Sequence, residues 1–249
     1  MNQQQAQTVI GLSRTCTLKM TTTLDTEFNA IQNLKWLPWI GENYLTAPTN
    51  NKVLFIGESH YYNPDEKGSF EKHQNNGYTR IVIEKVAIEK EYKEYKNKAA
   101  KIFPNIHFTF LGNDNSDTKL FWNKVAYYNF IQKPMNTNQG RPTKIDNLNG
   151  WTNFDEVINI IKPDTCIFLG NSAAKYFPKL FNSVTKIISP PTDYGWINNS
   201  ASKKAEIQLH NGQQVKLLFI RHPSNYYSWQ EWNKHLMNRV PDIMNWLKA

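Results

Sequence analysis

The sequence of 249 residues contains only two cysteines, Cys16 and Cys166, and no long hydrophobic run. Two cysteines cannot build a disulfide framework, a four-thiolate zinc site or a four-cysteine iron–sulfur cluster without outside ligands. The longest apolar runs, such as residues 53–57 and 217–220, are far shorter than the roughly 20 residues of a membrane-spanning helix. No signal-peptide pattern opens the chain. We therefore expect a soluble, cytoplasmic protein with no cofactor and no membrane contact.

Acidic residues are in the minority: 29 Lys and Arg against 21 Asp and Glu give a net charge of +8. Such an excess favours a polyanionic partner such as nucleic acid without requiring one. Hydrophobic residues make up 40% of the chain, with 8 Trp, 12 Tyr and 13 Phe, which suffices for a sizeable core. This composition excludes a disordered or fibrous protein.

The chain shows no internal repeat and no Pro- or Gly-rich linker long enough to divide it. Residues 1–25 are rich in Gln and Thr and have no sustained apolar period, so we expect a flexible N-terminal arm there. Residues 26–249 are expected to form a single domain. We expect the protein to be a monomer.

Four short apolar segments have the character of buried strands: residues 52–57, 125–131, 165–170 and 215–220. A weaker strand candidate lies near residues 185–189. Helical patterns alternate with the strands, at residues 81–95, 154–161 and 172–177 and, behind a capping-box spacing of Ser228 and Glu231, towards Ile243. This alternation predicts a three-layer α/β/α sandwich with a central, mainly parallel sheet.

Polar residues follow each predicted strand, at the edge where parallel sheets bind their ligands. The first strand runs into Gly57-Glu58-Ser59-His60-Tyr61, which brings a carboxylate, a hydroxyl, an imidazole and a phenol into one turn. Asn129, near the end of the second strand, can offer a donor and an acceptor to a planar ligand. Gly170-Asn171-Ser172 opens a helix, and the last strand runs into Arg221-His222-Pro223-Ser224. The pattern predicts a binding or catalytic site at this edge.

Read together, these motifs resemble the uracil-DNA glycosylase superfamily over roughly residues 52–240. The resemblance implies a four-stranded parallel sheet with helices on both faces and an enzyme that flips a damaged base into a pocket at the strand ends. His-Pro-Ser after an apolar strand is the most specific element. The motifs are Gly57-Glu-Ser-His-Tyr-Tyr-Asn63, Lys67-Gly-Ser-Phe70, Tyr128-Asn-Phe130, residues 163–174 and His222-Pro-Ser224.

The resemblance also implies roles for single residues. Phe70 would stack on the flipped base, Asn129 would read its pyrimidine edge, and Tyr61 matches a tyrosine that blocks the methyl group of thymine. His222 would donate a hydrogen bond to the base oxygen on which negative charge develops. Tyr226 stands where the family places an apolar wedge that enters the DNA stack. The remaining contacts with the base or with DNA would come from Gly57, Ser59, Asn171, Ser172, Arg221 and Ser224.

The chain departs from the family at Ser59, which replaces the aspartate that positions the attacking water in the best-known members. Glu58 or His60 could take over this task. A glutamate also follows this glycine in the thermophile-type branch of the family, but the iron–sulfur cluster of that branch needs four cysteines and this chain has two.

Three functions follow from these residues. The first is a DNA glycosylase-like enzyme with Glu58, His60 and His222 as catalytic residues, acting on a damaged or modified, pyrimidine-type base. The second is a catalytically inactive module of the same fold that binds a base, a nucleotide or single-stranded nucleic acid. The third is a serine esterase that uses Ser59 and His222, although Phe219 stands where such esterases carry an acidic residue. No metal is expected, because the spacing of Glu58 and the histidines matches no metal-binding motif.

Overall fold

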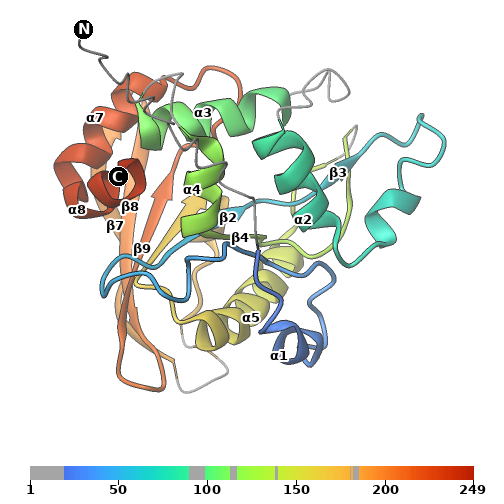
Figure 1. The fold of residues 1–249 in the computed structure, drawn as a ribbon, viewed down its shortest axis with the longest axis horizontal. Coiled ribbons are helices and arrows are strands. Elements are labelled where there is room, and N and C mark those ends of the chain that lie inside the picture. The colour runs from blue at the N-terminus through green and yellow to red at the C-terminus, as the bar shows by residue number, and fades with distance from the viewer. Residues whose placement is uncertain (1–19, 90–98, 113–116, 138–139, 180, 182–184) are drawn as a thin grey trace, which may run out of the picture.

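A computed structural model describes residues 20–89, 99–112, 117–137, 140–179, 181 and 185–249. These residues fold around a seven-stranded sheet in the order β1–β4–β2–β6–β9–β8–β7 (Figure 1). The four central strands are parallel to one another and correspond to the four apolar runs of the sequence, so the α/β prediction is confirmed. They are β4 (Ala126–Asn129), β2 (Val53–Gly57), β6 (Thr165–Leu169) and β9 (Gln214–Ile220).

The expectation of a four-stranded sheet is wrong, because three antiparallel strands extend it at both edges. β1 (Trp39–Ile40) pairs with β4, and the hairpin of β7 (Lys186–Ile197) and β8 (Ser200–Gln208) pairs with β9. The weak strand candidate at residues 185–189 is the start of β7. Exposed and half-buried positions alternate along most of β7, and buried positions are isolated along β8, so neither strand shows the continuous apolar run of a central parallel strand.

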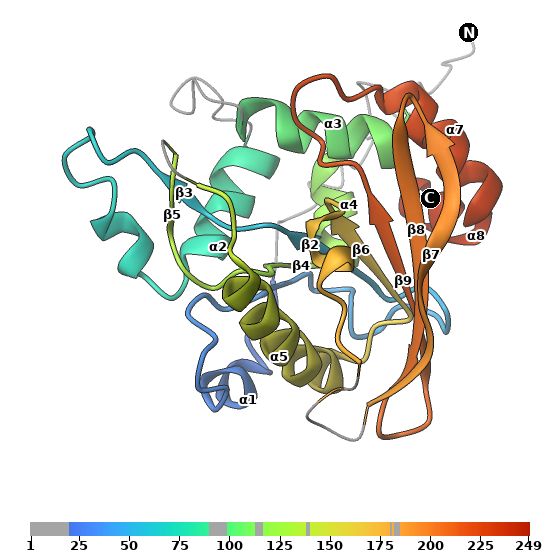
Figure 2. The ribbon, with the colours of Figure 1, turned by 180° about the vertical axis from the view of Figure 1, so that it is seen from behind.

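Each face of the sheet carries its own hydrophobic core. On one face α5 (Lys144–Ile161) packs through Trp151 and Phe154 against Leu54 and Phe168, and α1 (Asp25–Asn29) lies beside it (Figure 2). The opposite core contains Val53 and Phe55. It is covered by α3 (Ala99–Leu111), α4 (Thr118–Lys124), α7 (Trp229–Arg239) and α8 (Pro241–Lys248). The sheet therefore lies between two helical layers.

Short elements complete the fold around the strand ends. β3 and β5 form a separate parallel pair that projects beyond β2 and β4 (Figure 2). The sequence pattern around residues 81–88 forms an α-helix continued by a π-helix, whereas Tyr92 and Tyr95 lie outside the described residues. The short elements are β3 (Tyr61–Tyr62), β5 (Met135–Asn136), α6 (Ser172–Lys175), the 3-10 helix η1 (Glu71–Gln74), α2 (Tyr78–Val82) and the π-helix η2 (Ile83–Ile88).

Two helices have other boundaries than the sequence pattern predicts. α5 begins at Lys144 rather than after Asn153, because Thr143 and Asp146 form a capping box that satisfies free backbone N–H groups. Pro241 divides the predicted C-terminal helix into α7 and α8, since proline has no N–H to continue the helical hydrogen bonds. The predicted capping box at Ser228 does not form, because the Ser228 side chain makes no cap hydrogen bond.

The chain is attached to the sheet from Met20 onward. Met20 forms a bridge with Gly41, and the Thr21 N–H donates to the Ile40 carbonyl at 2.9 Å. Residues 1–19 of the expected N-terminal arm lie outside the described residues. Within the described part of the chain, no helix is both long and apolar enough to span a bilayer.

The contact between α5 and the sheet depends on a glycine. A Cβ at Gly150 would lie 2.6 Å from the ring of Phe130, which is itself buried against Trp151 and Phe168. We predict that Gly150→Ala lowers the free energy of unfolding by about 1–3 kcal/mol through overpacking, although alanine favours a helix. Urea denaturation would measure this change. The exposed neighbour provides the control, since Asn149→Ala should stay within roughly 0.5 kcal/mol of wild type; equal stability of both variants would contradict the prediction.

Candidate functional site

The Glu58 carboxylate lies directly beyond β2 and is held by three different segments. Tyr61 Oη donates to Glu58 Oε2 at 2.6 Å, and Ser172 Oγ donates to Glu58 Oε1 at 3.2 Å. Arg141 Nη1 lies 3.9 Å from Glu58 Oε2. The Glu58 side chain is 16% exposed, whereas the Arg141 side chain is 84% exposed. The carboxylate is thus fixed in place while its cationic neighbour remains open to solvent.

Tyr61 reaches Glu58 from β3, which pairs in parallel with β5. Burial, and next the Glu58 carboxylate, raise the pKa of Tyr61, so the phenol stays protonated and acts as a donor. The segment that carries Arg141 passes close to this ring at Gly140, where a Cβ would lie 2.8 Å from Tyr61 Cε1. A glycine at this position therefore lets Arg141 approach the carboxylate.

His222 belongs to the same site. Burial lowers the pKa of the His222 imidazole; the Glu58 carboxylate opposes this shift and the Arg141 guanidinium adds to it. A Cβ at Gly170, beyond the end of β6, would lie 4.0 Å from His222 Cδ2. The loop is braced from α3, because Asn105 Nδ2 donates to the Pro223 carbonyl at 3.2 Å. The fold therefore offers a neutral, partly buried imidazole next to Glu58.

Asn129 ends β4 directly beside Gly57, its partner in the β2–β4 register. The Asn129 side chain is 1% exposed; its Oδ1 accepts from Tyr127 Oη at 3.1 Å, but its Nδ2 has no partner among the described residues. A Cβ at Gly57 would overlap both Tyr127 Oη and Asn129 Oδ1. Because an unpartnered buried N–H group costs about 1–3 kcal/mol, this amide suits a ligand that supplies an acceptor.

A small hollow lies beside Glu58, between the ends of β2 and β6 and the start of α6. Its volume of about 10 Å³ is enough for one water molecule. A nucleobase is larger, so its entry would require side chains that line the hollow to move. The lining is Ile56, Gly57, Glu58, Phe130, Ile131, Asn147, Phe168, Leu169, Gly170, Ser172 and Ala173.

Ser59 and His60 point away from this arrangement. Ser59 Oγ lies within hydrogen-bond distance of three backbone carbonyls, at 2.7 Å from Lys133 O, 3.2 Å from Ile131 O and 3.3 Å from His60 O. Its single proton is therefore used to hold the turn to the segment between β4 and β5. This geometry argues against Ser59 as a nucleophile with His222 as its base.

His60 packs in an aromatic cluster under α2 instead of beside Glu58 and His222. Its Nε2 lies 2.9 Å from Thr79 Oγ1, and its ring meets the rings of Trp36 and Tyr78 edge-on at 4.7 Å. Burial, with a smaller contribution from His73, lowers the pKa of His60 to about 3. The structure therefore leaves Glu58 as the candidate general base.

The other candidate residues lie on separate parts of the fold. Phe70 is 45% exposed and meets Tyr62 edge-on at 5.2 Å, on the projecting part that contains β3. Arg221 Nη1 donates to Ser200 Oγ at 3.1 Å, and Asn171 Nδ2 donates to the Ala201 carbonyl at 2.7 Å. Both side chains thus bind the turn of the β7–β8 hairpin.

The loop after His222 exposes an aromatic side chain in an unusual backbone conformation. Tyr226 is 92% exposed and has a φ of 58°, in the left-handed region that costs a non-glycine residue about 1–2 kcal/mol. Lys101 Nζ lies 3.2 Å from Asn225 Oδ1 in the same loop, and the Ser224 N–H donates to the His222 carbonyl at 2.8 Å. The loop therefore presents a solvent-facing ring, and the neighbouring Asn225 binds the cationic side chain of Lys101.

Comparison with protein-family models gives no match, and comparison with curated proteins gives none. The function is therefore inferred from the geometry and chemistry of the site.

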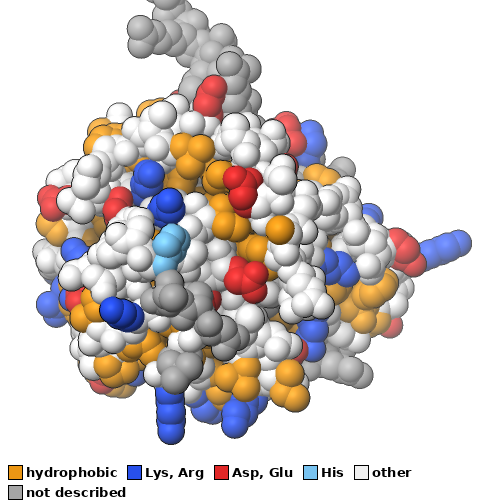
Figure 3. Space-filling model, turned by 90° about the horizontal axis from the view of Figure 1, so that it is seen from below, with side chains coloured by type: hydrophobic (Ala, Val, Ile, Leu, Met, Phe, Trp, Pro, Cys, Tyr) orange, Lys and Arg blue, Asp and Glu red, His pale blue; other side chains and the backbone are white. Residues whose placement is uncertain are grey.

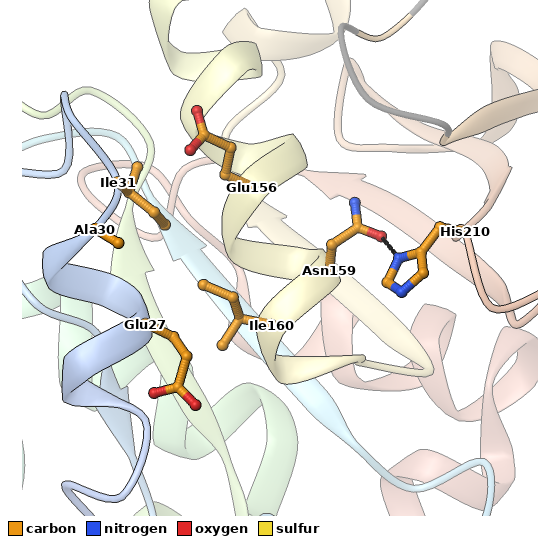
Figure 4. Close-up of a pocket in the computed structure, with 7 residues that line it drawn as sticks. All are labelled: Glu27, Ala30, Ile31, Glu156, Asn159, Ile160 and His210. Atoms are coloured by element: carbon orange, nitrogen blue, oxygen red, sulfur yellow. Dashed lines mark hydrogen bonds between the residues drawn. The ribbon is translucent and has the colours of Figure 1, made fainter.

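A second hollow lies at the C-terminal end of α5. Figure 3 shows apolar side chains at the centre of this face of the molecule, with acidic side chains and a histidine around them. The close-up shows the hydrogen bond between His210 Nδ1 and Asn159 Oδ1 (Figure 4), whose length is 2.5 Å. Among the described residues, no group of three or more His, Cys, Asp or Glu could hold a metal ion. The hollow is lined by Glu27, Ala30, Ile31, Glu156, Asn159, Ile160 and His210.

Sequence reasoning missed two features of the site. Arg141 lies in an irregular segment between β5 and α5, and no motif marks it; a basic residue between two predicted elements is the only signal available. Ser172 was expected to contact DNA, whereas its hydroxyl donates to Glu58.

The buried His60 makes stability depend on pH. Since the pKa of His60 is lowered from 6.5 to about 3 on folding, the unfolded chain binds a proton below pH 6.5 that the folded chain does not. The unfolding free energy must then decrease as the pH falls, by about 2 kcal/mol for this residue between pH 7.5 and pH 5. We predict that His60→Gln, which cannot titrate, has a correspondingly smaller difference between urea titrations at these two pH values. An unchanged difference would show that His60 titrates normally in the fold.

Proposed function

We propose that the protein is a DNA glycosylase-like enzyme that hydrolyses the N-glycosidic bond of a damaged or modified, pyrimidine-type base flipped out of DNA. The observation that carries this proposal is that the Glu58 carboxylate, held by Tyr61 and Ser172 directly beyond β2, and the His222 imidazole, just beyond β9, lie at the carboxyl ends of the parallel strands and interact electrostatically. The parallel strands between two helical layers and the net charge of +8 support it as well.

Each residue has a defined task in this reaction. Glu58 accepts a proton from a water molecule whose oxygen bonds to C1′ of the sugar. The bond between C1′ and the base nitrogen breaks, and its electron pair leaves with the base. His222 donates an N–H hydrogen bond to the base oxygen on which the negative charge collects. The proton on Glu58 balances the charge of the departing base, which then takes up a proton.

Arg141 and Asn129 account for substrate binding. The Arg141 guanidinium is exposed and bound loosely to Glu58, so a DNA phosphate can take over this contact. The free Asn129 Nδ2 is a donor for a carbonyl oxygen of a pyrimidine, while Asn129 Oδ1 is already used by Tyr127.

A second candidate is a binding module of the same fold without catalytic activity. Both Glu58 oxygens already accept hydrogen bonds, from Tyr61 and Ser172, and Ser59 replaces the usual aspartate. A carboxylate engaged in this way can serve to order the site. Tight binding of a modified base without turnover, unchanged by Glu58→Ala, would favour this module.

The first test is base release. DNA panels containing uracil, hypoxanthine and hydroxymethylated or glucosylated pyrimidines are incubated with the protein, and the free base is measured by mass spectrometry. We predict release of at least one base, reduced roughly 100- to 1,000-fold by His222→Ala and by a similar factor in Glu58→Gln. Glu27→Gln, which changes an exposed carboxylate in the second hollow, should retain wild-type release. Absence of release from every substrate would refute the enzymatic proposal.

Tyr226 provides a second test, since a wedge is needed only where a base must leave a stacked duplex. We predict that Tyr226→Gly lowers base release from duplex DNA roughly 10-fold, because unstacking is no longer compensated by the inserted ring. Release from single-stranded DNA should change little. Because glycine tolerates a φ of 58°, the variant should be at least as stable as wild type in thermal unfolding. Equal losses on single and double strands would contradict a wedge.

A further inference from the structure

The tip of the β7–β8 hairpin is a rigid, tight turn. Ile197 pairs with Ser200, so only Asn198 and Asn199 connect the strands, and both have positive φ angles of 45° and 62°. Two consecutive left-handed residues are typical of the turn that best fits the twist of a two-stranded hairpin. Ile197 is 6% exposed and is part of the core under α7, which anchors the tip to the body of the protein.

Trp196 stands exposed next to this anchor. Its side chain is 69% exposed, although its neighbour Ile197 is buried, because successive residues of a strand point to opposite faces. Opposite Trp196 in the register lies Ala201, whose small side chain leaves the indole uncovered. Tryptophan is enriched at interfaces because its indole combines a large apolar face with an N–H donor.

The hairpin tip is tied to the rim of the candidate site. The Ala201 carbonyl, opposite Trp196, accepts a hydrogen bond from Asn171, and the next residue, Ser172, donates to Glu58. Arg221, the neighbour of His222, donates to Ser200 in the same tip. Trp196 therefore lies at the edge of the sheet where Glu58 and His222 meet.

The chemistry of the hairpin favours the face of a nucleobase over a phosphate. Lys203 Nζ lies 2.9 Å from Asp193 and Lys204 Nζ lies 2.6 Å from Glu206, and both lysine side chains are only about one-third exposed. These ion pairs are closer and better shielded than the 3.9 Å pair of the 84% exposed Arg141, so a phosphate replaces them less readily. Another copy of the chain is a poor partner for this edge. β7 contains Pro190 and Pro191 and three register shifts, which hinder the pairing of a further strand.

We propose that Trp196 is a stacking platform for an unpaired nucleobase next to the flipped nucleotide, so that the β7–β8 hairpin is a second nucleic-acid contact. This inference rests on the proposed function, which supplies both the nucleic-acid partner and the flipped nucleotide. An indole offers a sequence-tolerant surface, because every base has an aromatic face. Tyr226 then fills the gap in the duplex, while Trp196 binds the unpaired strand.

Binding measurements on the full-length chain test the platform. Fluorescence anisotropy would follow a labelled 15-nucleotide thymidine strand and a strand of the same length made of abasic sugar phosphates. We predict that Trp196→Ala weakens binding of the thymidine strand roughly 10-fold, and that Trp196→Phe retains most of the affinity. Binding of the abasic strand should be the same in wild type and Trp196→Ala.

A matched control comes from the same strand. Ile188, also in β7, is 46% exposed but lies far along the hairpin from the tip, so Ile188→Ala should bind like wild type. Unchanged thymidine affinity in Trp196→Ala, or an equal loss for the abasic strand, would overturn the proposal. Base release measured in parallel separates the two proposals. Binding that depends on Trp196, without base release, would support the stacking platform and refute the glycosylase activity. Base release together with binding that does not depend on Trp196 would refute only the stacking platform.

Discussion

The double burial of β2 is the constraint on which the rest of the structure depends. Val53 and Phe55 enter one core while Leu54 and Ile56 enter the other, so this strand must be covered on both sides. Parallel neighbours on either side then bring the ends of β4 and β6 next to Gly57. Because the chain leaves the sheet at Glu58, the position of the carboxylate is set by the packing of the apolar residues that precede it in β2.

The same constraint explains how much the sequence could predict. Central strands are continuous apolar runs, so β2, β4, β6 and β9 could be found from the sequence, and with them the location of Glu58, Asn129 and His222 at one edge. β7 and β8 could not be found in this way, since β7 has only one buried residue, Ile197, and β8 has only isolated buried positions. In the turn after β2, the sequence alone could not decide whether Glu58 or His60 is the candidate general base. Only tertiary packing, which places His60 under α2, distinguishes the two.

Arg141 shows why electrostatic partners escape sequence reasoning. Its contact with Glu58 joins residues 83 positions apart and depends on the close passage of Gly140 along Tyr61. An exposed ion pair of this length contributes about 0–1 kcal/mol, so a phosphate can replace it at little cost. The departure of Arg141 would leave Glu58 with two neutral donors, Tyr61 and Ser172, and would remove the cation that helps to keep His222 neutral. Binding of a polyanion and the charge state of the site are therefore coupled.

Tyr226 and Trp196 share a physical feature that packing does not explain. Each ring is exposed next to a constrained stretch of backbone: Tyr226 has a positive φ, and Trp196 lies beside the tight turn and its buried Ile197. Exposed apolar surface and a left-handed tyrosine both reduce stability, so a fold selected for stability alone would remove them. Both rings lie at the edge of the parallel sheet that carries the Glu58 carboxylate and the His222 imidazole. Aromatic faces around such a site are suited to a ligand that is itself planar and stacked, and this matches a nucleobase in its strand better than an isolated small molecule.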